Sequence, residues 1–206
     1  MARLVLASRS PRRFSLLSIL GIPFEAAPPG EEIEVRGGPC DDPCTLAKRN
    51  AVSKALSVHG PPDTMVVAFD TVVWKEGYAY GKPASLDEAY GMLRELSGGW
   101  HEVHTAVCVI DMGRGESISE CEVTRVKFKE LTEREIELYI STGEALDAAG
   151  GYAIQGLASL LIERIEGDYF NVVGLPLHRL RSMLQSLGVD LLEEAVRMRK
   201  ARVNLS

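Results

Sequence analysis

Apolar residues recur along this chain with two different spacings, which predict two kinds of element. Continuous or alternating apolar residues are typical of strands, and apolar residues repeated every three or four positions are typical of helices. We therefore expect strands over residues 3–7, 65–69, 100–110, 119–128 and 157–165. We expect helices over residues 11–20, 45–59, 85–97 and 132–140, then a turn over 167–171 and final helices over 177–202. Strands that alternate with helices favour a mixed, twisted α/β sheet flanked by helices.

The first predicted helix has a clear start. Ser10 is placed to act as its N-cap, and Pro11 suits its first position because proline lacks the amide hydrogen that is unpaired there. Phe14, Leu17 and Leu20 follow at three-residue spacing and predict the face that packs on the core.

Two later helices begin with the pattern of a capping box. Ser85 precedes one helix, with Glu88 three residues on, and Thr132 precedes another, with Glu135 three residues on. In this arrangement the hydroxyl and the carboxylate satisfy backbone amides that the helix leaves unpaired. The pattern predicts where both helices start.

A carboxylate interrupts the most apolar strand. Residues 65–69 are all apolar, Asp70 follows them, and apolar residues 72–73 continue the run. A charge in such a segment needs partners. Residues 76–77 predict a hairpin tip that returns Lys82 towards Asp70. A carboxylate and a lysine placed in this way, Asp70 and Lys82, suit a site for a metal ion and phosphate. The alternative is a turn held by a salt bridge.

Arg12 and Arg13 occupy an unfavourable place in the first turn of a helix. Cations oppose the helix dipole there unless an anion binds between them and the free backbone amides. The conflict predicts a phosphate cradle, although the Walker glycines are missing. The alternative is that both arginines are simply solvated.

Two further segments carry candidate ligand contacts. Lys54 lies beside an alanine face of its helix, so it either points inward to an anion or extends along the surface into water. Residues 143–156 are rich in small side chains, and this allows a ligand to approach the backbone, Asp147 and Gln155 closely. The alternative for that stretch is an ordinary glycine loop.

Composition and charge narrow the classes of function. Of the 206 residues, 46% are apolar and 25% charged, as in ordinary globular proteins, and no apolar run reaches the length of a membrane span. The net charge of −6 disfavours broad binding to nucleic acid or to anionic membranes. The basic residues of the N-terminus follow its short apolar run, which is the reverse of a signal peptide. We expect a cytoplasmic protein whose residues 1–206 form one domain.

The cysteines and histidines do not predict a metal site. Cys40 and Cys44 are spaced like one half of a zinc motif, but no second pair matches them. We expect reduced thiols, with an exposed loop disulfide between Cys40 and Cys44 as the alternative. His101 and His104 are three apart on a predicted strand, so they face opposite sides of the sheet.

Taken together, the motifs resemble the Maf family of nucleoside triphosphate pyrophosphatases. The resemblance covers residues 4 to about 185 and rests on many motifs in order: Leu6-Ala7-Ser8-x-Ser10-Pro11-Arg12-Arg13, Lys54-Ala55, Asp70-Thr71-Val72-Val73, Gly81-Lys82-Pro83, Met92-Leu93-x-x-Leu96-Ser97-Gly98, His101-x-Val103-x-Thr105-x-Val107, Ala149-Gly150-x-Tyr152-x-Ile154-Gln155-Gly156 and Gly174-Leu175-Pro176-Leu177.

The resemblance implies a fold and a reaction. The fold is an elongated, two-lobed α/β structure with a central cleft, related to the inosine triphosphate pyrophosphatases. The reaction is metal-dependent hydrolysis of a nucleoside triphosphate to the monophosphate and pyrophosphate, with Mg²⁺ or Mn²⁺ as the cation. Residues 152–156 resemble the branch that prefers dTTP and UTP, and modified pyrimidine nucleotides are further candidates. A homodimer is the assembly that the family suggests.

The family pattern also implies roles for individual residues. Asp70 is the catalytic carboxylate and a metal ligand, and Lys82 assists catalysis. Glu32 is the candidate for a second acidic ligand, with a solvated acidic loop as the alternative. The positions implied to bind the substrate are Ser8, Arg12, Arg13, Lys54, Thr71 and Gln155.

Two positions depart from the family pattern. Ala68-Phe69 stands where the family often has Gly-Ala, and Ala148 stands where it has lysine in the motif Asp-Lys-Ala-Gly. We expect the missing lysine to weaken phosphate contacts or to alter specificity. A second hypothesis for the whole chain is a nucleotide-binding regulator of septum formation and cell division with little turnover, since the family has also been associated with that role.

Overall fold

The computed structural model describes residues 3–30 and 37–203. In chain order the elements are β1 (Arg3–Ala7), α1 (Pro11–Ile19), β2 (Glu25–Ala26), β3 (Gly38–Pro39), α2 (Pro43–Leu56), β4 (Thr64–Lys75), β5 (Tyr78–Tyr80), α3 (Leu86–Leu96), β6 (Trp100–Asp111), β7 (Glu116–Phe128), α4 (Glu133–Ile140), the 3₁₀ helices η2 (Glu144–Asp147), η3 (Ala149–Gly151) and η4 (Leu157–Leu161), β8 (Ile162–Glu166), α5 (Tyr169–Val173), α6 (Leu177–Ser186) and α7 (Leu191–Val203).

Within those residues, eight strands form one mixed sheet, with a main path in the order β2-β1-β4-β6-β7-β8. β1 runs parallel to both β2 and β4, whereas β4, β6, β7 and β8 pair antiparallel. The ladder between β4 and β6 extends from the pair Met65–Asp111 to the pair Trp74–Glu102 without a register shift. The predicted mixed α/β sheet is confirmed.

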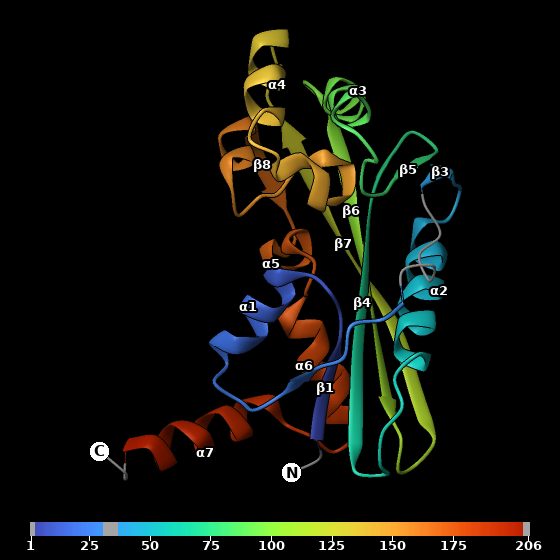
Figure 1. The fold of residues 1–206 in the computed structure, drawn as a ribbon, viewed down its shortest axis with the longest axis vertical. Helices are drawn as coiled ribbons and strands as arrows, with labels where there is room; N and C mark the ends of the chain where they lie inside the picture. Colours follow the sequence, from blue (N-terminus) through green and yellow to red (C-terminus); the bar gives the residue numbers. More distant parts are fainter. Residues whose placement is uncertain (1–2, 31–36, 204–206) are drawn as a thin grey trace.

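Helices cover the sheet differently at its two ends. Figure 1 shows an elongated molecule in which α1, α5 and α6 lie on one side of the long strands, α2 lies on the other, and α3 and α4 lie at the upper end. Three buried clusters follow this division: one packs α1 and α6 on the sheet, one packs α2 on its opposite face, and one joins α3 and α4 to the upper strands. This arrangement produces two lobes that share the same long strands.

The predicted start and turn signals are confirmed where they were strongest. The side chain of Ser10 accepts a hydrogen bond from the amide of Arg13, and Thr132 and Glu135 form a complete capping box. Glu76 and Gly77 both adopt positive φ angles at the tip of the β4–β5 hairpin. Positive φ at both central residues matches the right-handed twist of the flanking strands.

Four details of the prediction are wrong. Residues 157–161 form the helix η4 rather than a strand, because Ala158 and Leu161 are buried at a helical spacing of three while Leu160 is 74% exposed. The short helix α5 replaces the expected turn at 167–171. α2 begins at Pro43, two residues early, since Asp42 caps it. Phe14 is half-exposed, because α1 buries Leu16 beside the predicted Leu17.

The cysteine prediction is also wrong. Cys44 forms a disulfide with Cys121, while Cys40 and Cys108 are free. The first turn of α2 packs on β7 and brings the Cα atoms of Cys44 and Cys121 to 5.8 Å, a normal distance for a disulfide. Cys40 instead follows β3, where its amide donates to the carbonyl of Gly77.

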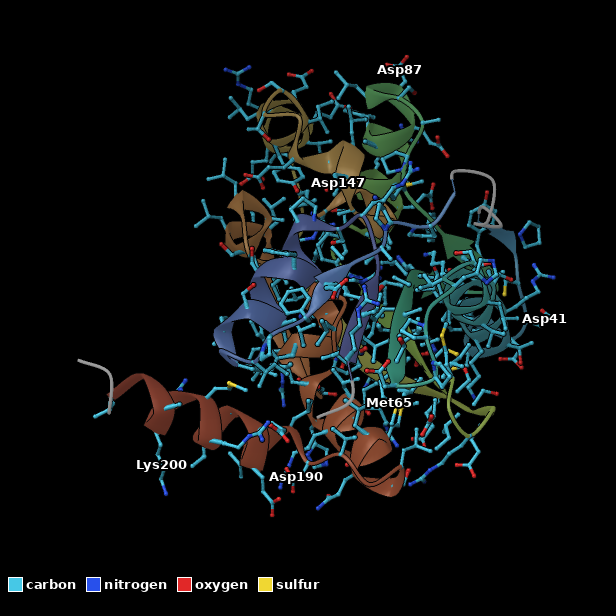
Figure 2. All side chains as sticks on the ribbon, turned by 60° about the horizontal axis from the view of Figure 1, so that its bottom comes forward. Asp41, Met65, Asp87, Asp147, Asp190 and Lys200 are labelled. Carbon is cyan, nitrogen blue, oxygen red and sulfur yellow. A yellow bond between two sulfur atoms is a disulfide. The ribbon has the colours of Figure 1, made fainter. Side chains whose placement is uncertain are left out.

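The C-terminal helix α7 extends away from the sheet (Figure 1). Figure 2 shows its side chains extending into open space between Asp190 and Lys200, away from the sheet. Leu191, at the start of α7, is buried in the cluster that packs α1 and α6 on the sheet, whereas Leu192 is 54% exposed. None of the helices in the described part of the chain has both the length and the apolarity needed to cross a lipid bilayer.

Candidate functional site

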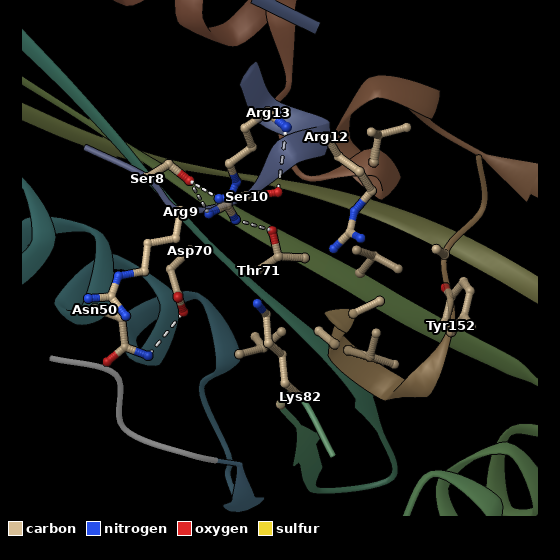
Figure 3. Close-up of a pocket in the computed structure, with 18 of the residues that line it drawn as sticks. Ser8, Arg9, Ser10, Arg12, Arg13, Asn50, Asp70, Thr71, Lys82 and Tyr152 are labelled. Carbon is tan, nitrogen blue, oxygen red and sulfur yellow. Dashed lines mark hydrogen bonds between the residues drawn. The ribbon is translucent and has the colours of Figure 1, made fainter. Parts of the chain in front are cut away.

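A cavity of about 440 Å³ lies between the two lobes, over the middle of β4. That volume is within the range typical of sites for small ligands. Its charged and polar lining residues come from the β1–α1 turn and the start of α1, from α2, from β4, from the segment after β5 and from the end of η3 (Figure 3). They are Ser8, Arg9, Ser10, Arg12, Arg13, Asn50, Lys54, Asp70, Thr71, Lys82 and Tyr152.

The alternation of β4 decides which way the central residues point. Odd-numbered residues such as Phe69 pack below α1, and even-numbered residues such as Ala68 pack below α2. Side chains of successive strand residues point to opposite faces. Asp70 therefore faces α2, and Thr71 faces α1.

Asp70 is held by two side chains of α2. Lys54 Nζ donates to Asp70 Oδ1 at 2.6 Å, and Asn50 Nδ2 donates to Asp70 Oδ2 at 3.0 Å. Asp70 is 5% exposed and Lys54 is 3% exposed, so the ion pair is buried. A buried carboxylate with a cation and a hydrogen-bond donor is stabilised in its charged form and in one orientation.

Arg13 lines the cavity, and its guanidinium also contacts backbone and side-chain oxygens of the protein. The guanidinium donates to the carbonyl oxygens of Gly174 at 2.8 Å and Phe69 at 3.0 Å, and to Thr71 Oγ1 at 3.0 Å. It also lies over the ring of Phe69, 5.8 Å from the centroid. Arg13 thus ties α1 to β4 and to the end of α5.

The N-terminus of α1 opens on the same cavity. Ser8 Oγ accepts a hydrogen bond from the amide of Ser10 at 3.1 Å, and Ser10 caps the helix through the amide of Arg13. A helix N-terminus attracts anions because its amides and its dipole both favour negative charge. The nine residues of α1 direct this end at the cavity beside Arg12.

A second charged cluster crosses the cavity between the lobes. Arg12 Nη1 lies 3.3 Å from Asp147 Oδ2, and Arg12 Nη2 donates to the backbone oxygen of Asp147 at 2.6 Å. Lys82 Nζ donates to Asp147 Oδ1 at 2.8 Å. Asp147 therefore sits between two cations that belong to different lobes.

The wall opposite Asp70 is apolar and closely packed. Gly150 has a φ of +70°, and a Cβ there would lie 2.8 Å from Val73 Cγ2, so glycine is required for this approach.

Tyr152 is buried beside Phe128, and its hydroxyl lies 2.8 Å from His101 Nε2. Burial, with a smaller contribution from the charge of Lys75, lowers the pKa of His101 to about 3.

Most of the residues expected at the site lie together. Ser8, Arg12, Arg13, Lys54, Asp70, Thr71 and Lys82 all line the cavity. Gln155 is exposed and is not among the lining residues, and Glu32 lies outside the described residues. The prediction that His101 and His104 face opposite sides is confirmed, since His101 contacts Tyr152 and His104 contacts Cys44.

Sequence reasoning did not find Asn50 or Arg9. Asn50 precedes Lys54 by four residues, so both lie on one face of α2, and this spacing would have indicated it once Lys54 was assigned to Asp70. Arg9 stands in the β1–α1 turn, where a polar residue is common and carries no signal of its own. Ala148, which replaces the lysine of the family motif, also lines the cavity.

The donor atoms near Asp70 suit a hard divalent cation. Mg²⁺ is usually held by one or two carboxylates, with phosphate oxygens and waters as its other ligands. Asp70 supplies a carboxylate to the lining of the cavity, and the other lining residues bring cations and hydroxyls for phosphate. The site therefore fits a magnesium or manganese ion bound together with a polyphosphate.

Known proteins resemble this chain over most of its length. A family model described as "Maf-like protein" matches residues 3–187. The chain is 47% identical over 197 residues to the dTTP/UTP pyrophosphatase of Caldicellulosiruptor bescii, covering 94% of this chain and 98% of that protein. It is 47% identical over 192 residues to the dTTP/UTP pyrophosphatase of Syntrophomonas wolfei, covering 91% and 98%. A HAM1 protein from Coxiella burnetii matches over 100% of both chains with 13% identity and a TM-score of 0.47.

Proposed function

The chain belongs to the Maf-like protein family, and on that premise we propose that it hydrolyses nucleoside triphosphates to the monophosphate and pyrophosphate. Its relatives named dTTP/UTP pyrophosphatase support dTTP and UTP, with modified pyrimidine nucleotides as further substrates. The observation that carries the proposal is the carboxylate of Asp70, fixed by Lys54 and Asn50 in a cavity that also collects cations from both lobes.

Asp70 is the proposed proton acceptor. A water molecule attacks the α-phosphorus, the bond between that phosphorus and the bridging oxygen to the β-phosphorus breaks, and the proton of the water passes to Asp70. Lys54 and Asn50 hold the carboxylate in one orientation, so no reorganisation is needed when the water arrives. The role of Lys54 is then to position Asp70 rather than to bind phosphate directly.

Arg12 and Lys82 are the proposed contacts for the triphosphate. Both end at the edge of the cavity on Asp147, and an incoming triphosphate would take the place of that carboxylate. Cations placed against phosphate oxygens stabilise the negative charge that develops on the leaving pyrophosphate. Ser8 and the N-terminus of α1 add hydrogen-bond donors on the same side.

Arg13 and Thr71 form the floor of the proposed phosphate site. Their mutual hydrogen bond and the contacts of Arg13 with Phe69 and Gly174 keep the β1–α1 turn at a fixed distance from β4. Gln155 stays a candidate for substrate choice through the segment that it shares with Tyr152 and Ile154, both of which are buried. The apolar wall near Val73 and Tyr152 suits a nucleobase and sugar.

A divalent cation is part of the proposal. Asp70 would hold Mg²⁺ or Mn²⁺ together with the phosphate oxygens of the substrate, and Glu32 remains the candidate for a second acidic ligand. When bound, the cation supplies charge neutralisation on the phosphates and acidifies a coordinated water.

The test is an assay with separated products. The purified protein is incubated with each common nucleoside triphosphate and Mg²⁺ or Mn²⁺ in water enriched in ¹⁸O, and nucleotide, pyrophosphate and orthophosphate are resolved by mass spectrometry. We expect turnover of dTTP and UTP, with the ¹⁸O label in the monophosphate, because attack at the α-phosphorus places the new oxygen there. Asp70→Asn should lower turnover at least about 10²-fold. Asp63→Asn, at an exposed residue outside the cavity, is the matched control.

Other products would overturn the proposal. Diphosphate and orthophosphate would place the attack at the γ-phosphorus, and label in the pyrophosphate would place it at the β-phosphorus. Binding of nucleotides without any turnover would favour the regulatory function instead.

A further inference from the structure

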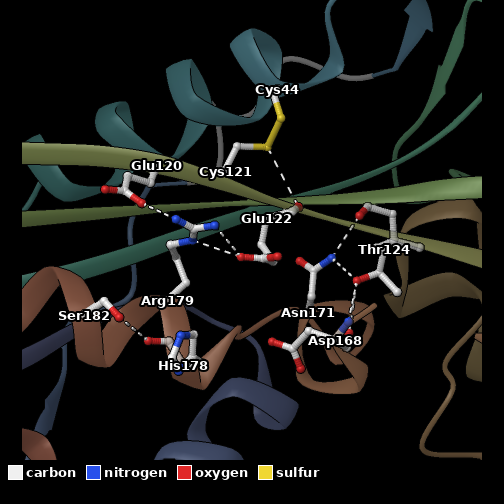
Figure 4. Close-up of polar contacts among 11 residues, drawn as sticks. Cys44, Glu120, Cys121, Glu122, Thr124, Asp168, Asn171, His178, Arg179 and Ser182 are labelled. Atoms are coloured by element: carbon white, nitrogen blue, oxygen red, sulfur yellow. Dashed lines mark hydrogen bonds and ion pairs between the residues drawn. A yellow bond between two sulfur atoms is a disulfide. The ribbon is translucent and has the colours of Figure 1, made fainter. Parts of the chain in front are cut away.

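A cluster of three soft metal-binding side chains lies on the far face of the sheet from α1. Cys44 stands in the first turn of α2, His104 in β6 and Cys121 in β7, and their sulfur and nitrogen atoms all lie within 4.8 Å of one another. Figure 4 shows the Cys44–Cys121 disulfide joining α2 to β7 above the strands. None of these residues takes part in the proposed hydrolysis.

The sheet register creates this cluster. Cys121 pairs with Ala106 across the β6–β7 ladder, so His104, two residues from Ala106 along β6, points to the same face as Cys121. Diagonal neighbours of this kind lie within reach of long side chains. α2 crosses this face and brings Cys44 Sγ to 3.4 Å from His104 Nδ1.

His104 is oriented for coordination through Nδ1. Its other ring nitrogen, Nε2, lies 2.9 Å from Glu102 Oε2. A carboxylate on the second nitrogen is the usual support of a metal-binding histidine, since it fixes the ring and its tautomer. His104 is 6% exposed, so the surrounding residues also fix its position.

The distance between sulfur and nitrogen suits zinc better than the hard cation expected at Asp70, and the two bonded sulfurs must move apart after reduction to share one ion. Zinc binds thiolate at about 2.3 Å and imidazole at about 2.0–2.1 Å with tetrahedral angles, which places a sulfur and a nitrogen ligand about 3.5 Å apart. The Cys44 Sγ–His104 Nδ1 distance of 3.4 Å agrees with that separation. Two thiolates and an imidazole select zinc over magnesium, because soft ligands disfavour hard cations.

We propose that Cys44, Cys121 and His104 form a redox-gated zinc site. In the oxidised state the two sulfurs are joined as a disulfide. A dithiol reductant transfers two electrons and two protons to that bond and becomes a disulfide itself, leaving two thiols. One Zn²⁺ then binds both sulfurs and His104 Nδ1, two protons are released, and water takes the fourth position.

The disulfide state and the zinc-bound state both attach α2 to the sheet. The disulfide joins the N-terminal turn of α2 to β7, and the zinc ion would join the same turn to β6 and β7 after reduction. Asn50 and Lys54, which hold Asp70, lie farther along that helix. The site keeps α2 attached to the sheet under both oxidising and reducing conditions.

The test uses Co²⁺ and Zn²⁺ on the full-length protein. One sample is oxidised with diamide, and another is reduced with dithiothreitol and desalted without oxygen. We expect the reduced sample alone to bind one equivalent of Co²⁺ with a thiolate-to-cobalt charge-transfer band, and Zn²⁺ to displace it. Coordination at Asp70 gives no such band, because its ligands are oxygens.

Variants identify the ligands. The double variant Cys44→Ser, Cys121→Ser should lose the band, and alkylating the reduced native protein should have the same effect without any mutation. Glu102→Gln should weaken zinc binding about 10- to 100-fold, as expected for loss of a second-sphere carboxylate. Cys40→Ser is the matched control and should keep the band. Absence of the band in the reduced protein, or its persistence in the double variant, would overturn the proposal.

Discussion

Two charged clusters meet at the cavity, and they differ in their contact with water. The ion pair between Asp70 and Lys54 is buried, with side-chain exposures of 7% and 3%. Asp147, in contrast, bridges Arg12 and Lys82 with side-chain exposures of 51%, 24% and 46%. The first cluster joins β4 to α2, and the second connects the two lobes.

The difference in exposure separates two tasks. A buried ion pair is costly to break from one side, because the remaining charge is left without a partner in a medium of low dielectric constant. An exposed pair contributes little stability and exchanges partners readily. The buried cluster is therefore suited to fixing a catalytic group, and the exposed cluster is suited to releasing Asp147 in favour of a phosphate.

The largest effect is expected from Asp70→Asn. The amide keeps the shape of the side chain but does not accept a proton from water, so kcat should fall about 10²- to 10⁴-fold. Pyrophosphate release from dTTP and UTP measures this, with circular dichroism to verify folding. A variant with nearly normal kcat would mean that the buried cluster is structural only.

The second effect concerns stability and contrasts the two lysines. Lys54→Met leaves the charge of Asp70 buried without its cation, so the free energy of unfolding should fall by about 3–5 kcal/mol. Lys82→Met removes an exposed partner and should change it by no more than about 1 kcal/mol. Urea denaturation of both variants measures the contrast. Equal losses would show that burial does not distinguish the clusters.

His101 extends the contrast to a buried group behind the cavity-lining Tyr152. Its pKa is about 3 in the folded protein and about 6.5 when unfolded. Between these values the unfolded chain binds a proton on His101 that the folded chain does not. The contribution of His101 to the free energy of unfolding is therefore constant above about pH 6.5 and falls by about 1.4 kcal/mol per pH unit below it. His101→Gln should remove this part of the slope in urea denaturation between pH 7.5 and 5. An unchanged slope would assign the acid sensitivity to other groups.

The smallest effect is expected from Lys82→Met on substrate use. Loss of one exposed phosphate contact should lower kcat/KM for dTTP about tenfold, mainly through kcat because the charge stabilised there develops on the leaving pyrophosphate, and make the remaining activity less sensitive to salt, since exposed charges are screened. Lys127→Met is the matched control, because Lys127 forms an exposed ion pair with Glu163 away from the cavity. Identical salt dependence in both variants would contradict a role for Lys82 at the phosphates.

The sequence was most informative where one local rule decides the outcome. Ser10 and Thr132 cap their helices as predicted, and Asp70 interrupts a buried strand as its pattern indicated. Partners that meet only through packing were not predictable in the same way. The Cys44–Cys121 disulfide joins residues 77 positions apart, and the link between Arg12 and Asp147 joins residues 135 apart. The motif likewise predicts that Arg13 binds phosphate, yet in the structure its guanidinium donates hydrogen bonds to Gly174 and Thr71.

The long ladder between β4 and β6 has a consequence for motion. It stays paired from Met65–Asp111 to Trp74–Glu102 and passes under the cavity at Asp70–Ala106. Bending the molecule there would break a row of backbone hydrogen bonds at once, so the two lobes have no hinge within these strands. Movement on binding belongs to the rim, to the side chain of Arg12 and the 3₁₀ segment of Asp147. The sheet is rigid and the rim of the cavity is adjustable. Asp70 keeps its position while the charged residues around it change partners.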